Sequence, residues 1–190
     1  MRAPGLSVPS SAGRAPEADS RARARGFPPI SRPHAGLLIL GSMPSRESLR
    51  RRQYYAHPRN AFWPIVIELF GLEAGTYAER AAELAQKGVA VWDVLKTCYR
   101  SSSLDSDIDE GSMEVNDFPR FFRDHPGTGR VFFNGAKAES IYRRRVLPTL
   151  SDRDATRQLL RLPSTSPAHA SLSLEQKKAA WAVLLEPGPH

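Results

Sequence analysis

Short runs of apolar residues alternate with longer amphipathic segments along most of this chain. Short, mainly apolar runs are typical of fully buried strands, and they occur at 37–40, 89–94, 131–133 and 159–162. Three of the four are followed by glycine, asparagine or proline. Segments with helical spacing occupy 62–70, 77–87, 118–125, 136–146 and 174–185. Parallel neighbouring strands require crossover connections, which helices usually supply. The alternation therefore predicts an α/β fold in which helices cover both faces of a central four-stranded parallel sheet.

Residues 1–34 differ in composition from the rest of the chain. They are rich in Arg, Ala, Pro, Ser and Gly and hold few large apolar side chains, so they bury too little surface to offset the entropy lost on ordering. We therefore expect a disordered basic tail over residues 1–34 and a single domain over residues 35–190. For the tail, an organelle transit peptide, an upstream start site and a nonspecific basic arm all remain open.

The net charge of +7 comes from 27 Lys and Arg against 20 Asp and Glu. The tail contributes +4 of this, so the total charge says little about a nucleic-acid partner. Local clustering is more informative, because one acid, Glu47, lies among the basic residues Arg46, Arg50, Arg51, Arg52 and Arg59. This cluster is either a phosphate-facing patch or the solvated face of a helix.

Neither a membrane partner nor an oxidising compartment is indicated. The chain has no run of about eighteen or more apolar residues, and its Arg-rich beginning lacks the hydrophobic centre of a secretory signal. Cys98 is the only cysteine, so no internal disulfide can form. We expect a cytoplasmic protein.

Each of the four predicted strands is followed by an unusual polar loop. The loops read "GSMPSRES…YYAHPRN", "WDVLKTCYRSSSLDSDI", "NGAKA" and "PSTSPAH" in chain order. In an open parallel sheet, ligands bind beyond the carboxyl ends of the strands. We therefore expect the four loops to meet at one edge of the sheet and to form a site there.

Several kinds of chemistry lack their sequence signatures. The histidines are scattered without metal-ligand spacing, so no metal site is expected. The nucleophile elbow of serine hydrolases, the Walker loop and the dinucleotide fingerprint are all absent. The polar loops instead offer amides, carboxylates, hydroxyls and aromatic rings. These groups suit recognition of a nucleobase and activation of water.

Four blocks of the sequence resemble the hypoxanthine (deoxyinosine) DNA glycosylase branch, family 6, of the uracil-DNA glycosylase superfamily. They are "LILGSMPSRESLRRRQYYAHPRNAFW", "VAVWDVL…SLDSDI", "VFFNGAKA" and "LPSTSPAHASLS", in the expected order within residues 36–185. The resemblance implies an α/β/α sandwich that needs no cofactor and excises deaminated bases from DNA. It also implies a monomer associated with a bacterial nucleoid.

One position departs from the pattern of most branches of that superfamily. Met43 stands where an acid or amide usually positions the attacking water, and a thioether cannot accept a strong hydrogen bond from water. The resemblance implies that the asparagine of "HPRN", Asn60, is the catalytic residue instead. The alternative is that Asn60 caps the helix that starts at residue 62, a position that asparagine favours.

The resemblance and the side-chain chemistry together predict the residues that bind the base: Gly41, Ser42, Met43, Tyr55, Phe62, Asp93 and Asn134. The Asp93 carboxylate would accept the N1–H of hypoxanthine while a backbone N–H donates to O6, or it is an ordinary strand-end acid. The aromatic rings would stack on the extruded base, or they belong to the core. Asn134 reads the base or forms the Asn-Gly turn.

A second set is predicted to bind the DNA backbone or to form a wedge: Ser45, Arg59, Lys137, Ser164, Thr165, Ser166 and His169. Hydroxyl groups donate to phosphates, and prolines keep the loop "PSTSPAH" stiff. Lys137 lies at a helix N-terminus, where anions are attracted. An ordinary Pro-Ser turn and a solvated lysine are the competing interpretations.

These observations predict a monofunctional DNA glycosylase that excises hypoxanthine, with uracil as the nearest alternative substrate. No lysine is placed as a Schiff-base nucleophile, so strand cleavage is not expected. Two other hypotheses remain, namely a noncatalytic module that binds damaged or single-stranded DNA, and a hydrolase of free nucleosides.

Overall fold

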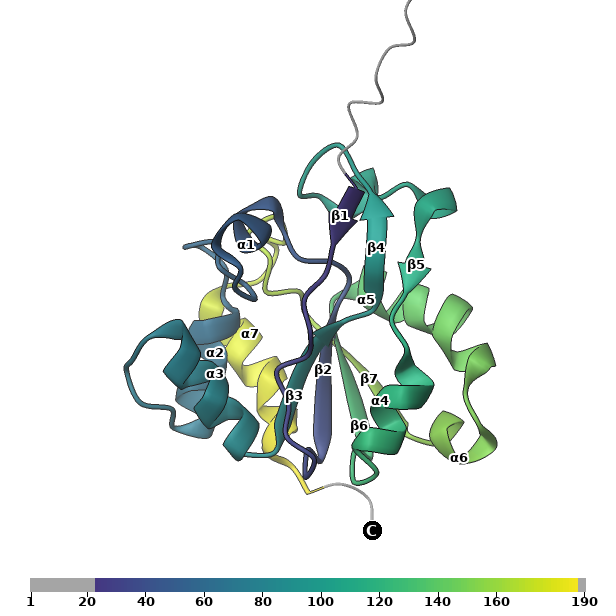
Figure 1. The fold of residues 1–190 in the computed structure, drawn as a ribbon. Coiled ribbons are helices and arrows are strands. Elements are labelled where there is room, and N and C mark those ends of the chain that lie inside the picture. The colour runs from purple at the N-terminus through teal and green to yellow at the C-terminus, as the bar shows by residue number, and fades with distance from the viewer. Residues whose placement is uncertain (1–22, 188–190) are drawn as a thin grey trace, which may run out of the picture.

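The computed structural model describes residues 23–187, and its centre is a parallel sheet with strand order β3-β2-β6-β7 (Figure 1). The strands are β2 (Leu37–Gly41), β3 (Val89–Asp93), β6 (Arg130–Asn134) and β7 (Gln158–Leu162). All three pairings are parallel. The predicted four-stranded sheet is confirmed, and no strand end differs from the predicted one by more than one residue.

Helices lie on both sides of this sheet, as Figure 1 shows. Helices α2, α3 and α7 are on one side and α4 and α5 on the other, so the predicted three-layer sandwich is confirmed. The helices are α1 (Arg46–Arg51), α2 (Phe62–Phe70), α3 (Tyr77–Gln86), α4 (Phe118–Asp124), α5 (Ala136–Ile141), α6 (Asp152–Ala155) and α7 (Leu174–Trp181). A π-helical turn (Tyr142–Val146) extends α5, and 3-10 turns follow at Leu147–Thr149 and Ala182–Leu185.

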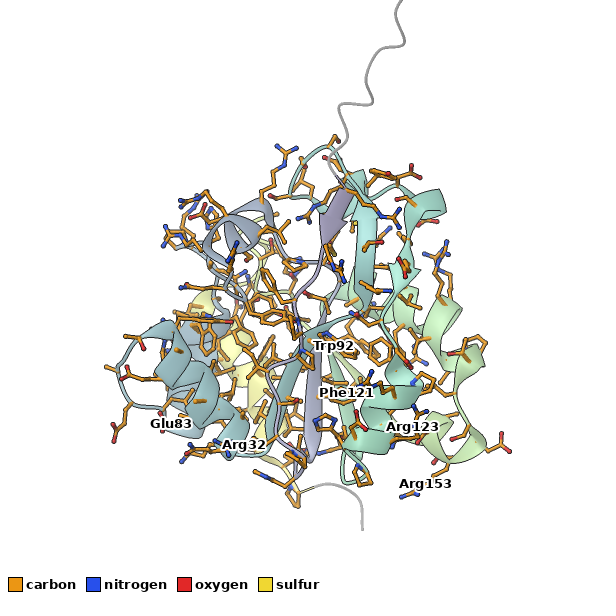
Figure 2. All side chains as sticks on the ribbon, viewed as in Figure 1. Arg32, Glu83, Trp92, Phe121, Arg123 and Arg153 are labelled. Atoms are coloured by element: carbon orange, nitrogen blue, oxygen red, sulfur yellow. The ribbon has the colours of Figure 1, made fainter. Side chains whose placement is uncertain are left out.

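The central strands β2 and β3 are mainly apolar because both of their faces are covered. All five residues of β2 and all five of β3 are buried. Figure 2 shows Trp92 of β3 beside Phe121 of α4, and the two rings stack with centroids 5.3 Å apart. Helix ends follow local rules as well, since Thr76 forms a capping box at the start of α3 and Gly71 ends α2 at a φ of 60°.

A small antiparallel sheet, with order β1-β4-β5, was not predicted. It consists of β1 (Arg23–Arg25), β4 (Leu95–Tyr99) and β5 (Glu114–Val115). In Figure 1 it stands beyond the end of the central sheet at which β3 finishes. Strand β4 follows β3 after the single residue Val94, so no turn signal separates the two strands in the sequence.

The prediction of a disordered tail over residues 1–34 is wrong for its second part. Strand β1 pairs with β4, and Ile30 pairs with Val91 of β3. The indole of Trp92 also donates a hydrogen bond of 3.0 Å to the carbonyl oxygen of Phe27. Backbone pairing holds residues that have few apolar side chains, which a composition argument overlooks. Residues 1–22, the rest of the predicted tail, lie outside the described residues.

Over residues 23–187 the chain forms no helix that is long and apolar enough to cross a bilayer. Cys98 is buried in β4.

Candidate active site

A pocket of about 330 Å³ lies at the carboxyl edge of the central sheet, where the four polar loops meet as expected. Its volume falls within the usual range of small-ligand sites. The lining residues are Gly41, Ser42, Met43, Pro44, Ser45, Ser48, Tyr54, Tyr55, Asn60, Asp93, Ser103, Leu104, Asp105, Asn134, Gly135, Ala136, Ser164, Thr165, Ser166, Ala168 and His169. This set contains all but three of the predicted site residues. The exceptions are Phe62, Arg59 and Lys137.

The ends of β2 and β3 form the floor of the pocket. Gly41 lies opposite Asp93 in the parallel register. A Cβ atom on Gly41 would lie 2.3 Å from Oδ1 of Asp93 and 3.0 Å from the hydroxyl of Tyr55. Because residue 41 has no side chain, the carboxyl and the phenol can approach each other at the floor.

Asp93 is enclosed, with only 3% of its surface exposed. Its Oδ2 atom is buried and makes no hydrogen bond to any described residue. Burial, and secondly the charge of Asp105, raise the pKa of Asp93 to about 8, although Arg100 acts in the opposite direction. The carboxyl is therefore mainly uncharged at neutral pH.

Asn60 lines the pocket and also braces the start of α2. Its Oδ1 accepts a hydrogen bond of 2.9 Å from the backbone N–H of Phe62. Its own backbone N–H donates to the carbonyl oxygen of His57 at 2.8 Å. No hydrogen bond connects its Nδ2 with another described residue. The N-cap of α2 is Ala61, and no side chain caps this helix, so the expectation that Asn60 is the N-cap is wrong. Asn60 precedes the N-cap, and its bond to the N–H of Phe62 orients the amide at the pocket.

Asn134 and Thr165 are joined by two hydrogen bonds of 2.8 Å. Oδ1 of Asn134 accepts from the backbone N–H of Thr165, and Nδ2 donates to the Thr165 hydroxyl. The Asn134 amide, predicted to read the base or form a turn, is thus engaged by the loop at 163–169. Thr165 is 1% exposed, so it does not present its hydroxyl to a phosphate as predicted. Both residues instead position the loop.

Other groups fix the same loop along its length. The indole N–H of Trp181 donates to the carbonyl oxygen of Pro163 at 2.9 Å. The ammonium group of Lys177 donates to the carbonyl oxygen of His169 at 2.7 Å. The backbone N–H of Ala61, next to Asn60, donates to the carbonyl oxygen of Thr165 at 3.0 Å. The loop is therefore tied directly to the turn that carries Asn60.

Of the two aromatic residues predicted to bind the base, only Tyr55 lines the pocket. Tyr55 lines the pocket with a positive φ of 55°, and Phe62 stacks behind its ring with centroids 4.0 Å apart. Phe62 is fully buried and does not face the pocket, so it supports the Tyr55 ring rather than a base. The Tyr55 hydroxyl lies near Asn134, and burial raises its pKa far above the usual range.

The residues predicted to bind the DNA backbone are dispersed around the pocket. Ser45 caps helix α1, since its hydroxyl accepts from the backbone N–H of Ser48 at 3.1 Å. Ser164, Ser166 and His169 line the pocket from the loop. Lys137 lies outside it and forms an ion pair with Glu110 at 3.1 Å.

The arginine cluster is divided between the two interpretations: some of its members form the solvated face of a helix, and another is free to face a phosphate. Arg50 and Arg51 lie on α1 and pair with Glu47, which lowers the pKa of that carboxyl to about 2 through hydrogen bonds to the two guanidinium groups. They form the solvated face of a helix. Arg59 is exposed, adjoins Asn60 and forms no ion pair with any described residue, so it remains available to a phosphate.

The loop after β4 supplies pocket residues that sequence reasoning did not single out: Ser103, Leu104 and Asp105. Oδ1 of Asp105 accepts a hydrogen bond of 2.5 Å from the hydroxyl of Ser42. These residues lie in a block already recognised as a polar loop. The sequence did not assign them to the site because the unpredicted strand β4 separates them from β3. The loop after β4 then brings the chain back to the pocket.

Within residues 23–187 no three His, Cys, Asp or Glu side chains are grouped so as to hold a metal ion. The pocket instead combines amide, carboxyl and hydroxyl groups with the ring of Tyr55. Together with the parallel sandwich, this defines the class of the protein as an α/β protein with a small-ligand pocket at the carboxyl edge of its sheet. The family model of the uracil DNA glycosylase superfamily matches residues 28–185, and the chain belongs to that superfamily.

Relatives narrow this assignment. A protein of Methanosarcina acetivorans named hypoxanthine DNA glycosylase is 37% identical over 137 residues, which cover 67% of this chain and 85% of the relative. A Methanosarcina barkeri protein of the same name is 32% identical over 166 residues, covering 83% and 95% of the two chains. The predicted resemblance to the hypoxanthine branch is thereby confirmed.

The fold also matches a solved structure. The solution NMR structure of a candidate uracil DNA glycosylase from Methanosarcina acetivorans has a TM-score of 0.69 and 33% sequence identity. The match covers 87% of this chain and all of that one.

Proposed function

We propose that this protein is a monofunctional DNA glycosylase that hydrolyses the N-glycosidic bond of deaminated bases in DNA, chiefly hypoxanthine. The observation that carries the proposal is the single pocket in which Asn60, Asp93 and the loop at 163–169 meet. Two relatives named hypoxanthine DNA glycosylase support the choice of base. Uracil is the second candidate, because the NMR structure that shares this fold is described as a candidate uracil DNA glycosylase.

In the proposed reaction, Asn60 holds the attacking water. Its Oδ1 is oriented by the N–H of Phe62 and has a second lone pair for a water molecule. An amide is not a base at neutral pH, so cleavage of the bond precedes attack. The electron pair of the glycosidic bond moves into the base, the sugar becomes oxocarbenium-like, and water then bonds to C1′. The water loses a proton to solvent, and the departing base takes one up.

The floor of the pocket would hold the extruded base. Tyr55 offers a ring face for stacking, and Phe62 fixes that ring from behind. Asp93 and the backbone around Ser42 and Met43 supply hydrogen-bonding groups at the strand ends. Among the described residues, no lysine lines the pocket, so the proposed mechanism does not include an imine with the sugar.

The loop at 163–169 would bind the DNA backbone. It is fixed by Asn134, Lys177 and Trp181 before DNA arrives, so little ordering entropy is lost on binding. Ser164 and Ser166 are partly exposed and can donate to phosphates. Arg59 adds a positive charge next to Asn60.

We also propose that the protein acts as a cytoplasmic, nucleoid-associated monomer. Sedimentation with and without a DNA duplex tests the stoichiometry. One protein molecule is expected for each lesion.

A panel of oligonucleotides, each with one hypoxanthine, uracil or xanthine, tests the function. We expect an alkali-labile abasic site at the hypoxanthine position and no strand break before alkali is added. Binding to the hypoxanthine strand without an abasic site would indicate a noncatalytic module. Equal hydrolysis of free deoxyinosine and of the oligonucleotide would indicate a nucleoside hydrolase.

A further inference from the structure

The floor of the pocket contains a carboxyl group with an unsatisfied oxygen. Asp93 is 3% exposed, its Oδ2 has no hydrogen-bond partner among the described residues, and Gly41 leaves the space beside Oδ1 open toward Tyr55. Buried polar atoms are normally satisfied, so an unpaired one on a residue that lines a pocket indicates a missing ligand. The proposed function supplies that ligand, namely the carbonyl edge of a deaminated base.

The chemistry of base departure determines which form of this carboxyl is useful. When the glycosidic bond breaks, negative charge builds up on the base and spreads onto its carbonyl oxygen. A carboxylate in the same enclosed space would repel that charge, whereas an uncharged acid stabilises it by donating a hydrogen bond. The observed burial of Asp93 favours the uncharged form.

We propose that Asp93 is a catalytic residue that acts as an uncharged carboxylic acid, donating its O–H to the carbonyl oxygen of the departing base. Its other oxygen can accept the neighbouring ring N–H, such as N1–H of hypoxanthine. The proton remains on Asp93 in this step, and only a hydrogen bond is strengthened. This inference rests on the proposed function and assigns a role opposite to that of the carboxylate acceptor expected from the sequence.

The groups that face Asp93 set the pH range of its acid form. Asp105 raises its pKa and Arg100 lowers it. The phenols of Tyr54, Tyr55 and Tyr77 lie near it as well. Burial, and to a smaller extent the proximity of Asp93, raises the pKa of each phenol, so they stay uncharged. Asp93 is thus the group in this set whose protonation changes near pH 8.

Single-turnover excision from an inosine oligonucleotide, measured across pH, tests the proposal. The wild-type rate should be level near neutral pH and should fall above about pH 8, by about tenfold per pH unit. Asp93→Asn, whose amide donates at every pH, should retain activity within about tenfold of wild type. Its rate should also no longer fall at alkaline pH because of residue 93. Any fall that remains in this variant measures the ionisation of inosine itself. Asp93→Ala should lose about 100-fold or more.

Asp105→Asn adds a control on the electrostatics. Removal of this charge lowers the pKa of Asp93, so the alkaline fall should begin at a lower pH. If Asp93→Ala does not fold, the wild-type, Asp93→Asn and Asp105→Asn profiles still decide the question.

Infrared difference spectra of wild type against Asp93→Asn provide a readout that does not depend on activity. A protonated-acid carbonyl band at pH 7 that disappears at higher pH supports the proposal.

An inactive Asp93→Asn variant, with a wild-type rate that stays level or rises through pH 9, would show that Asp93 works as a carboxylate and overturn the inference alone. Full activity of Asp93→Ala would also overturn it alone. Absence of inosine excision by the wild type at every pH would overturn the proposed function and this inference together.

Discussion

Asn134 and Thr165, which are 31 residues apart in the sequence, are joined by two hydrogen bonds of 2.8 Å in the lining of the pocket. The pair connects the end of β6 to the loop that is proposed to bind the DNA backbone. Through the bond between the Ala61 N–H and the Thr165 carbonyl oxygen, it also reaches the turn that carries Asn60. The same hydrogen bonds therefore position both the loop proposed to bind the DNA backbone and the turn whose asparagine is proposed to hold the water.

Asn134→Ala should lower kcat/KM by about tenfold, because two hydrogen bonds of about 1 kcal/mol each no longer fix the loop. Faster amide exchange over residues 163–169 should accompany the loss. Thr165→Val removes one of the two bonds, and the double variant should lose less than the sum of the single losses. Strict additivity in this cycle would contradict the proposed coupling.

Gly41→Ala should reduce excision by more than about tenfold and lower the melting temperature. The new Cβ would lie 2.3 Å from Oδ1 of Asp93 and would displace the carboxyl or the strand. Gly36→Ala is the matched control on the segment leading into β2, since its Cβ would meet no atom within 4 Å. Equal activities of the two variants would mean that the geometry of the pocket floor is not critical.

The raised pKa of Asp93 should also make the free energy of unfolding depend on pH. Burial raises the pKa of Asp93 from 3.8 to about 8, so in this pH range the folded state retains a proton that the unfolded state has lost. Stability should therefore fall as pH rises between about 4 and 8, by up to about 1.4 kcal/mol per pH unit from this group.

Denaturant titrations of wild type and Asp93→Asn at several pH values measure this effect. The variant should be the more stable protein at pH 8, and the difference should shrink toward pH 4. A difference that is constant with pH would contradict the assigned protonation state.

Arg59→Ala should weaken DNA binding and reduce the salt slope of the binding constant by about 1, as expected for one lost phosphate contact. Arg123→Ala is the charge-matched control, because Figure 2 shows this exposed arginine at the opposite end of the sheet from the pocket. Fluorescence anisotropy over a range of salt concentrations measures both slopes. Identical slopes for the two variants would remove Arg59 from the interface.

The central sheet could be predicted because burial on both faces leaves a strong local signal. Every residue of β2 and β3 is buried, so these strands read as short, mainly apolar runs. Strand β1 leaves no such signal. It consists of two arginines around one alanine, and it is held by backbone pairing to β4, 74 residues away.

The candidate site was predictable to the extent that it follows the strand ends. Gly41, Asp93 and Asn134 are the last residues of central strands and Ser164 follows β7, and the parallel topology brings these strand ends together. The engagement of Asn134 with Thr165 depends on the distance between two loops, which no local pattern records. The uncharged state of Asp93 likewise follows from burial, which becomes visible only once the chain is folded.

The most direct test of the proposed chemistry is single-turnover excision by Asn60→Ala on duplex DNA with one hypoxanthine. Loss of the bond to Phe62 costs about 1 kcal/mol of stability, so the assay is run well below the melting temperature of the variant. We predict a rate lowered by about 100-fold or more, with a dissociation constant within about threefold of wild type. An excision rate equal to that of wild type would contradict this prediction.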